Sequence, residues 1–235
     1  MSEEVDPERN AAMPRKKKIE KEEEKQSQIE TEELTDEEAY QLVNLINASQ
    51  GTASNKPRIV SLYGEIDEEQ CSEVSFTLIA LSEMGPLYQS EEGEEPRGEP
   101  IKLLISTPGG SASDMLSVYD AMRMVKTLCD VETVGLGKVM SAGVLLLAAG
   151  SKGHRKIGEN CRVMIHGVAA GAGGHVSTLE NELEEIKYTQ DQYIKLLARE
   201  TDMTVTYIKK LINKKINVYL TATEAVELGI ADEVV

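Results

Sequence analysis

The sequence predicts an α/β fold in which short strands alternate with helices around a mainly parallel sheet. Apolar, β-rich segments bounded by glycine or polar turns predict the strands. These strands are expected at 59–64, 101–105, 131–136 and 162–165. Because 40% of the residues are hydrophobic but only 4% are aromatic, an aliphatic core is expected.

Helices are predicted where apolar residues recur every three or four positions. They are expected at 71–84, 114–126, 141–149 and 177–200. The last of these carries Leu179, Leu183, Ile186, Tyr193 and Leu197 on one face, which is the spacing of an amphipathic helix. Between the elements, residues 88–100 are rich in glutamate, glycine and proline and predict an acidic surface loop.

The chain divides into a charged extension, 1–56, and a folded domain, 57–235. Residues 1–38 contain 14 acidic and 7 basic side chains and almost no large apolar ones, which predicts disorder. A short helix is expected at 36–48, followed by a linker that ends near Lys56. The basic run at 15–18 is interpreted as part of a solvated tail.

Charge and composition exclude several classes of protein. A formal net charge of -16 argues against binding to nucleic acid through phosphate contacts. No apolar stretch predicts a membrane span or a secretory signal. Cys71, Cys129 and Cys161 are scattered, so we expect buried thiols in a reducing compartment and neither disulfides nor a metal site. A cytoplasmic protein is expected.

Ser141 and His166 are the candidate catalytic pair. The serine lies among small residues, directly before the apolar run 144–149, and the histidine follows the strand expected at 162–165. A serine becomes a nucleophile when a base lies within hydrogen-bond reach, and this chain has only 3 histidines.

A glycine turn at residues 108–110 supplies a second candidate feature. It lies where a strand hands over to a helix, and glycines let backbone N–H groups approach a ligand closely. Such donors stabilise a developing oxyanion by roughly 3 kcal/mol each. The amide of Ala142, directly after the serine, is expected to be a second donor.

These segments together resemble the ClpP family, the self-compartmentalising serine peptidases of the Clp system. Thr-Pro-Gly-Gly-Ser at 107–111 matches the family's Ser-Pro-Gly-Gly-Ser, and residues 137–143 match its Gly-Met-Ala-Ala-Ser-Met-Gly. Val-Met-Ile-His at 163–166 is identical to the family motif, and residues 220–234 match its C-terminal signature. The resemblance extends from Ile59 to Val235.

This resemblance implies a ClpP/crotonase-like fold with a handle, made here by a glycine-rich strand at 167–176 and the helix at 177–200. It implies two stacked heptameric rings whose chamber holds polypeptide substrates, with a Clp ATPase or a second ClpP-type subunit as possible partners and no cofactor. Catalysis is assigned to Ser141 and His166. The oxyanion hole is assigned to the amides of Gly109 and Ala142, and the substrate groove to Gly110, Gly171 and Gly173.

The third member of the triad departs from the family. Counting back three residues from Leu220 reaches Asn217 where the family has an aspartate, and no carboxylate lies between Asp202 and Glu224. An asparagine orients the imidazole but does not stabilise the imidazolium by charge. Three interpretations follow: a slow Ser-His-Asn site, a carboxylate recruited from elsewhere, or a subunit of low activity. We favour the first.

The extension is a second departure, because it lacks the short apolar loop with which family members usually contact an ATPase. The competing hypotheses are a weakly active or non-catalytic subunit of a mixed ring and a phage-type head-maturation peptidase that needs no ATPase. A crotonase-type acyl-CoA enzyme is disfavoured by the serine–histidine spacing. His154 is expected in a basic surface loop at 152–156, and His175 at the end of the glycine-rich strand.

Overall fold

The computed structural model of the protein describes residues 57–84, 87–88, 97–171, 173–213 and 216–235. The charged extension with its expected helix and linker lies outside these residues, as does most of the expected acidic loop. No helix of the described residues is long and apolar enough to cross a membrane.

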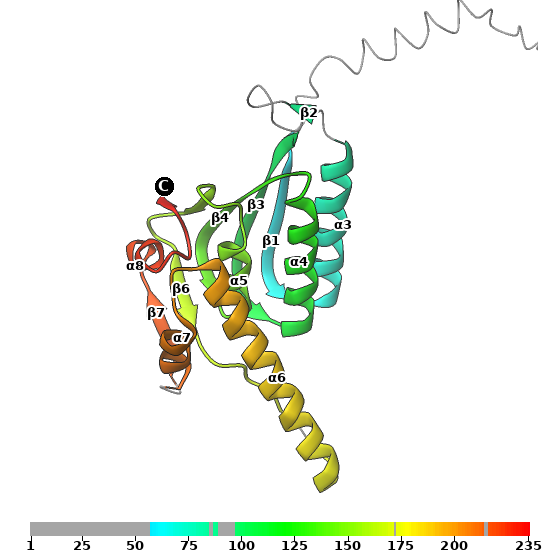
Figure 1. Ribbon diagram of the computed structural model, residues 1–235, viewed down its shortest axis with the longest axis vertical. Helices are drawn as coiled ribbons and strands as arrows, with labels where there is room; N and C mark the ends of the chain where they lie inside the picture. The colour runs from blue at the N-terminus through cyan, green and yellow to red at the C-terminus, as the bar shows by residue number, and fades with distance from the viewer. Residues whose placement is uncertain (1–56, 85–86, 89–96, 172, 214–215) are drawn as a thin grey trace, which may run out of the picture. The chain divides into compact units, whose positions relative to one another are not determined.

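The described strands form one 8-stranded sheet, which confirms the predicted α/β class (Figure 1). Its central path runs β1-β3-β4-β5-β8, and every pair along this path is parallel. The strands are β1 (Ile59–Ile66), β2 (Leu87–Tyr88), β3 (Arg97–Gly110), β4 (Cys129–Met140), β5 (Arg155–Ile157), β6 (Arg162–Ile165), β7 (Val218–Leu220) and β8 (Glu233–Val234).

Strand β4 has two successive parallel neighbours on one side. Its residues 133–135 pair with β5, and its residues 138–140 pair with β6. Strand β7 then adds to β6 in the antiparallel direction, and the short β2 pairs antiparallel with β3. The C-terminal ends of β4 and β6 therefore lie side by side, which positions the residues that follow each strand.

The helices are α3 (Glu68–Met84), α4 (Ala112–Val125), α5 (Ala142–Ala148), α6 (Val176–Glu200), α7 (Val205–Ile212) and α8 (Ala222–Glu227). Polar caps fix the starts of α4 and α8: the Ser111 side chain accepts from the Asp114 amide, and Thr221 and Glu224 form a capping box. Figure 1 shows α3 and α4 side by side, next to β1. All 7 residues of α5 are buried, so this helix forms the centre of the domain.

The core is aliphatic, as expected from the composition. Leu103 and Ile105 of β3 are fully buried, and so are Leu145, Leu146 and Leu147 of α5. The three cysteines are free and buried, which confirms the prediction of buried thiols. Burial raises the pKa of the Cys71 thiol to about 11, with the nearby Asp114 and Asp67 carboxylates adding to the shift. This thiol is therefore protonated at neutral pH and unreactive.

The prediction of a glycine-rich strand at 167–176 is wrong. Its described residues, 167–171 and 173–175, have no strand structure, and α6 begins at Val176. A strand needs a hydrogen-bonding neighbour, and glycine loses more conformational freedom on ordering than any other residue. Figure 1 shows the N-terminal half of α6 extending away from the sheet. Its apolar residues Val176 and Leu183 are 73% and 50% exposed.

Arg155 corrects a second expectation, because it does not lie in a surface loop. It begins β5 and is 4% exposed, whereas its neighbour His154 is exposed as predicted. Its guanidinium pairs with the Asp232 carboxylate and donates from Nη1 to the Gly229 and Glu200 carbonyl oxygens at 2.7 and 2.8 Å. A basic residue is stable at this depth because a carboxylate and carbonyl oxygens accept from its donors, and these partners lie 45 to 77 positions further along the chain.

Candidate active site

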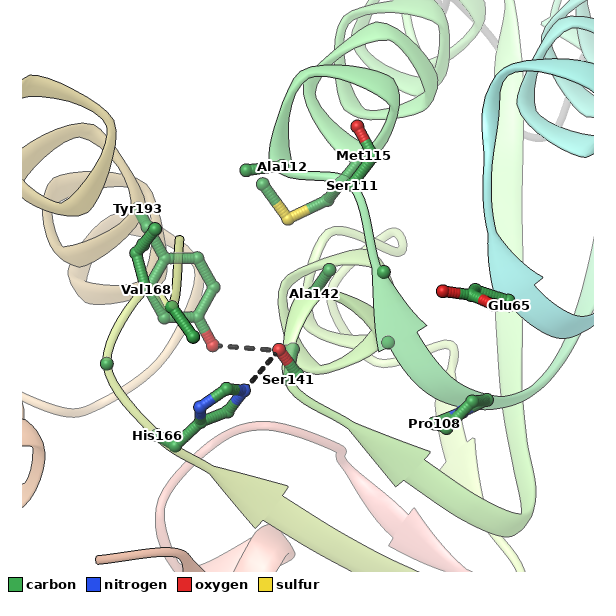
Figure 2. Close-up of a pocket in the computed structure, with 14 residues that line it drawn as sticks. Glu65, Pro108, Ser111, Ala112, Met115, Ser141, Ala142, His166, Val168 and Tyr193 are labelled. Carbon is green, nitrogen blue, oxygen red and sulfur yellow. Dashed lines mark hydrogen bonds between the residues drawn. The ribbon is translucent and has the colours of Figure 1, made fainter. Parts of the chain in front are cut away.

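Ser141 and His166 are brought together by the pairing of β4 with β6. Met140 lies opposite Met164 in this parallel ladder, and the Ser141 amide continues it by donating to the Met164 carbonyl oxygen at 2.7 Å. The next side chains beyond the paired ends are then neighbours. His166 Nε2 lies 2.7 Å from Ser141 Oγ, which is a hydrogen-bond distance (Figure 2).

The backbone of Ser141 makes a sharp turn between β4 and α5. Its φ of 54° is the one positive value among the non-glycine residues described. This region is strained for a residue with a Cβ atom, and such strain concentrates at functional sites. A strained strand-to-helix turn is also the arrangement that exposes the nucleophilic serine of α/β-hydrolases. The turn thus presents the hydroxyl to the space beside His166.

Tyr193 of α6 holds this turn from the other side. Its hydroxyl donates to the Ser141 carbonyl oxygen at 3.2 Å, and its side chain is buried (Figure 2). Burial raises the pKa of the Tyr193 phenol, so the hydroxyl stays protonated and keeps its role as donor. A hydrogen bond to the carbonyl of a strained residue stabilises the peptide orientation that the strain opposes.

The glycine turn lies directly against Ser141. Gly109 has a φ of 100°, and a Cβ atom at this position would lie 2.6 Å from Ser141 Cβ. A Cβ atom on Gly110 would lie 2.2 Å from the Ile66 carbonyl oxygen of β1. Both positions therefore exclude a side chain. The Gly109 N–H donates to Thr107 Oγ1 at 3.0 Å, which fixes the turn from within.

A cavity of about 520 Å³ joins these residues. Ser141, Ala142, His166 and both glycines line it, together with the apolar Met115 and with Tyr193. Its size fits the side chains of a short peptide segment. Glu65, at the end of β1, is the only carboxylate among its lining residues.

A second cavity, of about 390 Å³, lies beside His166 and contains the predicted third residue. Asn217 lines it together with His166, Gln190 and Asn213. Within the described part of the chain, no hydrogen bond joins Asn217 to the imidazole. The lining contains three side-chain amides and no carboxylate. Sequence and structure thus both place amide groups, and not an acid, on this side of the histidine.

The remaining predicted site residues lie away from the cavities. Gly171 and Gly173 have no neighbouring atoms within 4 Å of a built Cβ position, and neither lines the cavity that holds Ser141. His175 is the N-cap residue of α6 and is exposed. Within the described residues, no group of three or more His, Cys, Asp or Glu side chains is arranged to hold a metal ion.

Sequence reasoning missed three residues of the site. Thr107 and Glu65 bracket the glycine turn. Tyr193 reaches Ser141 from a helix residue 52 positions further along the chain. One signal in the sequence could have indicated Tyr193: it is a tyrosine on an otherwise apolar helix face. The hydroxyl of a buried tyrosine usually donates to a partner.

Replacing Tyr193 with phenylalanine is expected to lower kcat by about three- to tenfold, the equivalent of one neutral hydrogen bond. The change removes the donor to the Ser141 carbonyl but keeps the packing of the ring. KM should change little, because the tether acts on the nucleophile and not on bound peptide. Steady-state kinetics with a fluorogenic peptide measure both constants.

Tyr188→Phe is the matched control on the same helix. Its hydroxyl is bound by Gln192 at 2.8 Å, and the residue is 60% exposed. Equal kinetics for the two variants would show that the Tyr193 hydroxyl does not position Ser141.

Comparisons with known proteins agree with this geometry. The family model described as Clp protease matches residues 46–235. The chain is also similar to the "ATP-dependent Clp protease proteolytic subunit 1" of Corynebacterium jeikeium (strain K411). The two are 32% identical over 180 residues, which cover 77% of this chain and 88% of the relative. The matched region contains every described element that builds the site, and the chain belongs to the Clp protease family.

Proposed function

We propose that the protein is a serine endopeptidase that cleaves polypeptides by acyl transfer. The observation that carries this proposal is the 2.7 Å contact between Ser141 Oγ and His166 Nε2 at the strained turn, inside a cavity of peptide size. Membership of a protease family supports the reaction class.

In the first half of the reaction, Ser141 Oγ attacks the scissile carbonyl carbon and gives its proton to His166 Nε2. The tetrahedral intermediate collapses as the C–N bond breaks, and His166 returns the proton to the departing amine. In the second half, a water attacks the acyl-enzyme, and His166 again takes and returns one proton. The release of the acid product restores the Ser141 hydroxyl.

The oxyanion is proposed to form between the glycine turn and the start of α5. Ala142 is the first residue of α5 and lines the cavity, and the first amides of a helix have no partner within the helix. The Gly109 amide serves as the second donor only if it releases Thr107 Oγ1, to which it donates at 3.0 Å.

Gly110 offers an alternative donor in the same turn. The Ser111 amide donates to the Ile66 carbonyl oxygen of β1. Successive amides of extended backbone point to opposite sides, so the Gly110 amide is directed away from β1. The Gly110 and Ala142 amides then form a donor pair that needs no rearrangement at Thr107.

Asn217 is proposed as the group that orients His166. When Nε2 accepts the serine proton, Nδ1 carries a hydrogen, and an amide oxygen in the second cavity is a suitable acceptor. The absence of a carboxylate from the residues that line this cavity disfavours a recruited acid. A slow Ser-His-Asn site is the consequence, because no negative charge faces the imidazolium.

Replacing Asn217 with aspartate is expected to raise kcat by roughly tenfold or more. In serine proteases the converse change lowers kcat by about 10⁴-fold, because the asparagine favours the wrong tautomer and lacks the charge. Single-turnover hydrolysis of a fluorogenic peptide measures the change. Asn213→Asp is the control, since Asn213 lines the same cavity and gains the same charge. A similar rise in both variants, or none in Asn217→Asp, would remove Asn217 from the third position.

The chain is further proposed to act as an oligomer, with the active sites inside a chamber of two heptameric rings. The exposed apolar residues Val176, Leu179 and Leu183 of α6 support an interface along the projecting helix. A Clp ATPase or a second ClpP-type subunit is a proposed partner, in keeping with the relative's printed name. A non-catalytic ring subunit and an ATPase-independent phage-type peptidase are the competing functions.

Hydrolysis of an internally quenched peptide by the purified oligomer tests the proposed function. We expect turnover that disappears in Ser141→Ala while the oligomer, sized by light scattering, is unchanged. An assembled wild-type protein without turnover would favour the structural-subunit alternative. Turnover that persists in Ser141→Ala would contradict the assignment of the nucleophile.

A further inference from the structure

The cavity around Ser141 has one charged wall. Glu65 lines it, and the other lining residues are glycines, alanines, apolar side chains, the serines, His166 and Tyr193. Glu65 is an exposed residue and takes part in none of the ion pairs within the described part of the chain. Its carboxylate is therefore available to a ligand in the cavity.

The position of Glu65 is fixed by the pairing of β1 with β3. Glu65 lies opposite Gly109 in the ladder, directly after Gly64, whose φ of 94° turns the strand end. Figure 2 shows Glu65 across the glycine turn from Ser141, with its carboxylate directed toward the turn. A substrate side chain in contact with Glu65 therefore belongs to a residue near the scissile bond and does not reach Ser141 itself.

The two helices that begin after the strand ends at this wall carry acidic and no basic residues in their first turns. Helix α3 begins directly after β1 with Glu68 and Glu69 in its first turn, and α4 begins after β3 with Asp114 in its first turn. Among the residues that the structure describes, no lysine or arginine lines the cavity. A cationic side chain is attracted to such a wall, and an acidic side chain is repelled from it.

We infer that Glu65 is a specificity-determining residue, and that it binds a lysine or arginine side chain of the substrate near the scissile bond. The inference rests on the proposed peptidase function and adds the substrate class. Substrates with a basic residue one or two positions from the cleaved bond are preferred, and those with an acidic residue there are disfavoured.

Internally quenched peptides that differ at one position test this inference. Lysine, glutamine or glutamate is placed in turn at each of the positions from two before to two after the scissile bond. For at least one position, kcat/KM should be about three- to fivefold higher for lysine than for glutamine, the ratio an exposed ion pair supports. At about 1 M salt, where the screening length is roughly 3 Å, the ratio should approach one.

Glu65→Gln should remove the lysine-to-glutamine ratio at that position. Glu73→Gln is the matched control, because Glu73 is an exposed residue of α3 outside the cavity and its loss changes the net charge equally. The wild-type ratio should persist in Glu73→Gln. Ratios near one at every position in the wild type, or a ratio retained in Glu65→Gln, would overturn the role of Glu65.

Failure of the proposed function has a different signature. Labelling of Ser141 by a fluorophosphonate is followed in parallel. Where turnover is slow, the protection that each peptide gives against labelling replaces kcat/KM in the lysine-to-glutamine ratio. A labelled Ser141 with equal protection by lysine and glutamine peptides overturns only the specificity. Absence of labelling overturns the peptidase assignment, and the specificity with it.

Discussion

Replacing His166 with alanine is expected to lower kcat by at least about 10³-fold. His166 Nε2 lies 2.7 Å from Ser141 Oγ, and without it no described group in hydrogen-bond contact with the hydroxyl serves as a base. In subtilisin, whose triad contains an aspartate, loss of the histidine lowers kcat by about 10⁶-fold. The smaller value is expected here because the proposed Ser-His-Asn site starts from a lower rate.

The measurement is single-turnover peptide hydrolysis by the assembled protein. His154→Ala is the control, because His154 is exposed and lies outside both active-site cavities, and it should keep the wild-type rate. The double variant Ser141→Ala/His166→Ala should be no slower than either single variant, since the two groups act as a unit. Additive losses would contradict a joint role.

Replacing Arg155 with methionine is expected to lower the free energy of unfolding by about 3–5 kcal/mol, the range for removing one partner of a buried ion pair. The guanidinium is 4% exposed and joins Asp232 to the carbonyl oxygens that end α6 and precede β8. Methionine fills a similar volume but leaves Asp232 and these carbonyl groups without their donor.

Urea unfolding at matched protein concentration measures this loss. Arg97→Met is the control, because its ion pair with Asp130 is about 40% exposed on both sides and should contribute less than about 1 kcal/mol. Equal midpoints for the two variants would show that Arg155 is not a structural centre of the domain.

The same ion pair predicts an acid dependence. Burial alone would raise the pKa of Asp232, but the hydrogen bonds and charge of Arg155 outweigh it and hold the pKa below its ordinary value of 3.8. The stabilisation is complete above that ordinary value and is lost as pH falls through the lower folded-state value. The stability gap between the wild type and Asp232→Asn should therefore narrow only below about pH 4. A gap that closes near pH 6 would contradict this origin.

Local patterns in the sequence were sufficient to predict the central elements. The apolar runs of β1, β3, β4 and β6 and the spacing in α3, α4, α5 and α6 all lie where they were expected. Strand β3 extends to Arg97–Gly110, well beyond the expected 101–105, because pairing with β1 on one side and β4 on the other orders polar and glycine residues that have little strand propensity. The short strands β5 and β8 depend on such partners entirely.

The proposed catalytic pair was predictable, but the residues that support it were not. Spacing and motifs indicate Ser141 and His166, whereas the ladder between β4 and β6 that joins them is a tertiary feature. Tyr193 and Glu65 contribute to the site from elements 52 residues after and 76 residues before Ser141, and no local pattern reports such contacts. Arg155 was misplaced for the same reason, since its burial depends on Asp232, 77 residues away.

Active-site labelling is the most direct measurement of whether this chain has a serine nucleophile. The assembled wild-type protein is treated with a fluorophosphonate, digested and mapped by mass spectrometry, with Ser141→Ala and His166→Ala alongside. A single adduct on Ser141 is expected, absent in Ser141→Ala and slowed at least tenfold in His166→Ala, because the reagent needs the same activated hydroxyl. An assembled wild-type protein that takes up no label, or takes it up equally in Ser141→Ala, would contradict a Ser141–His166 peptidase.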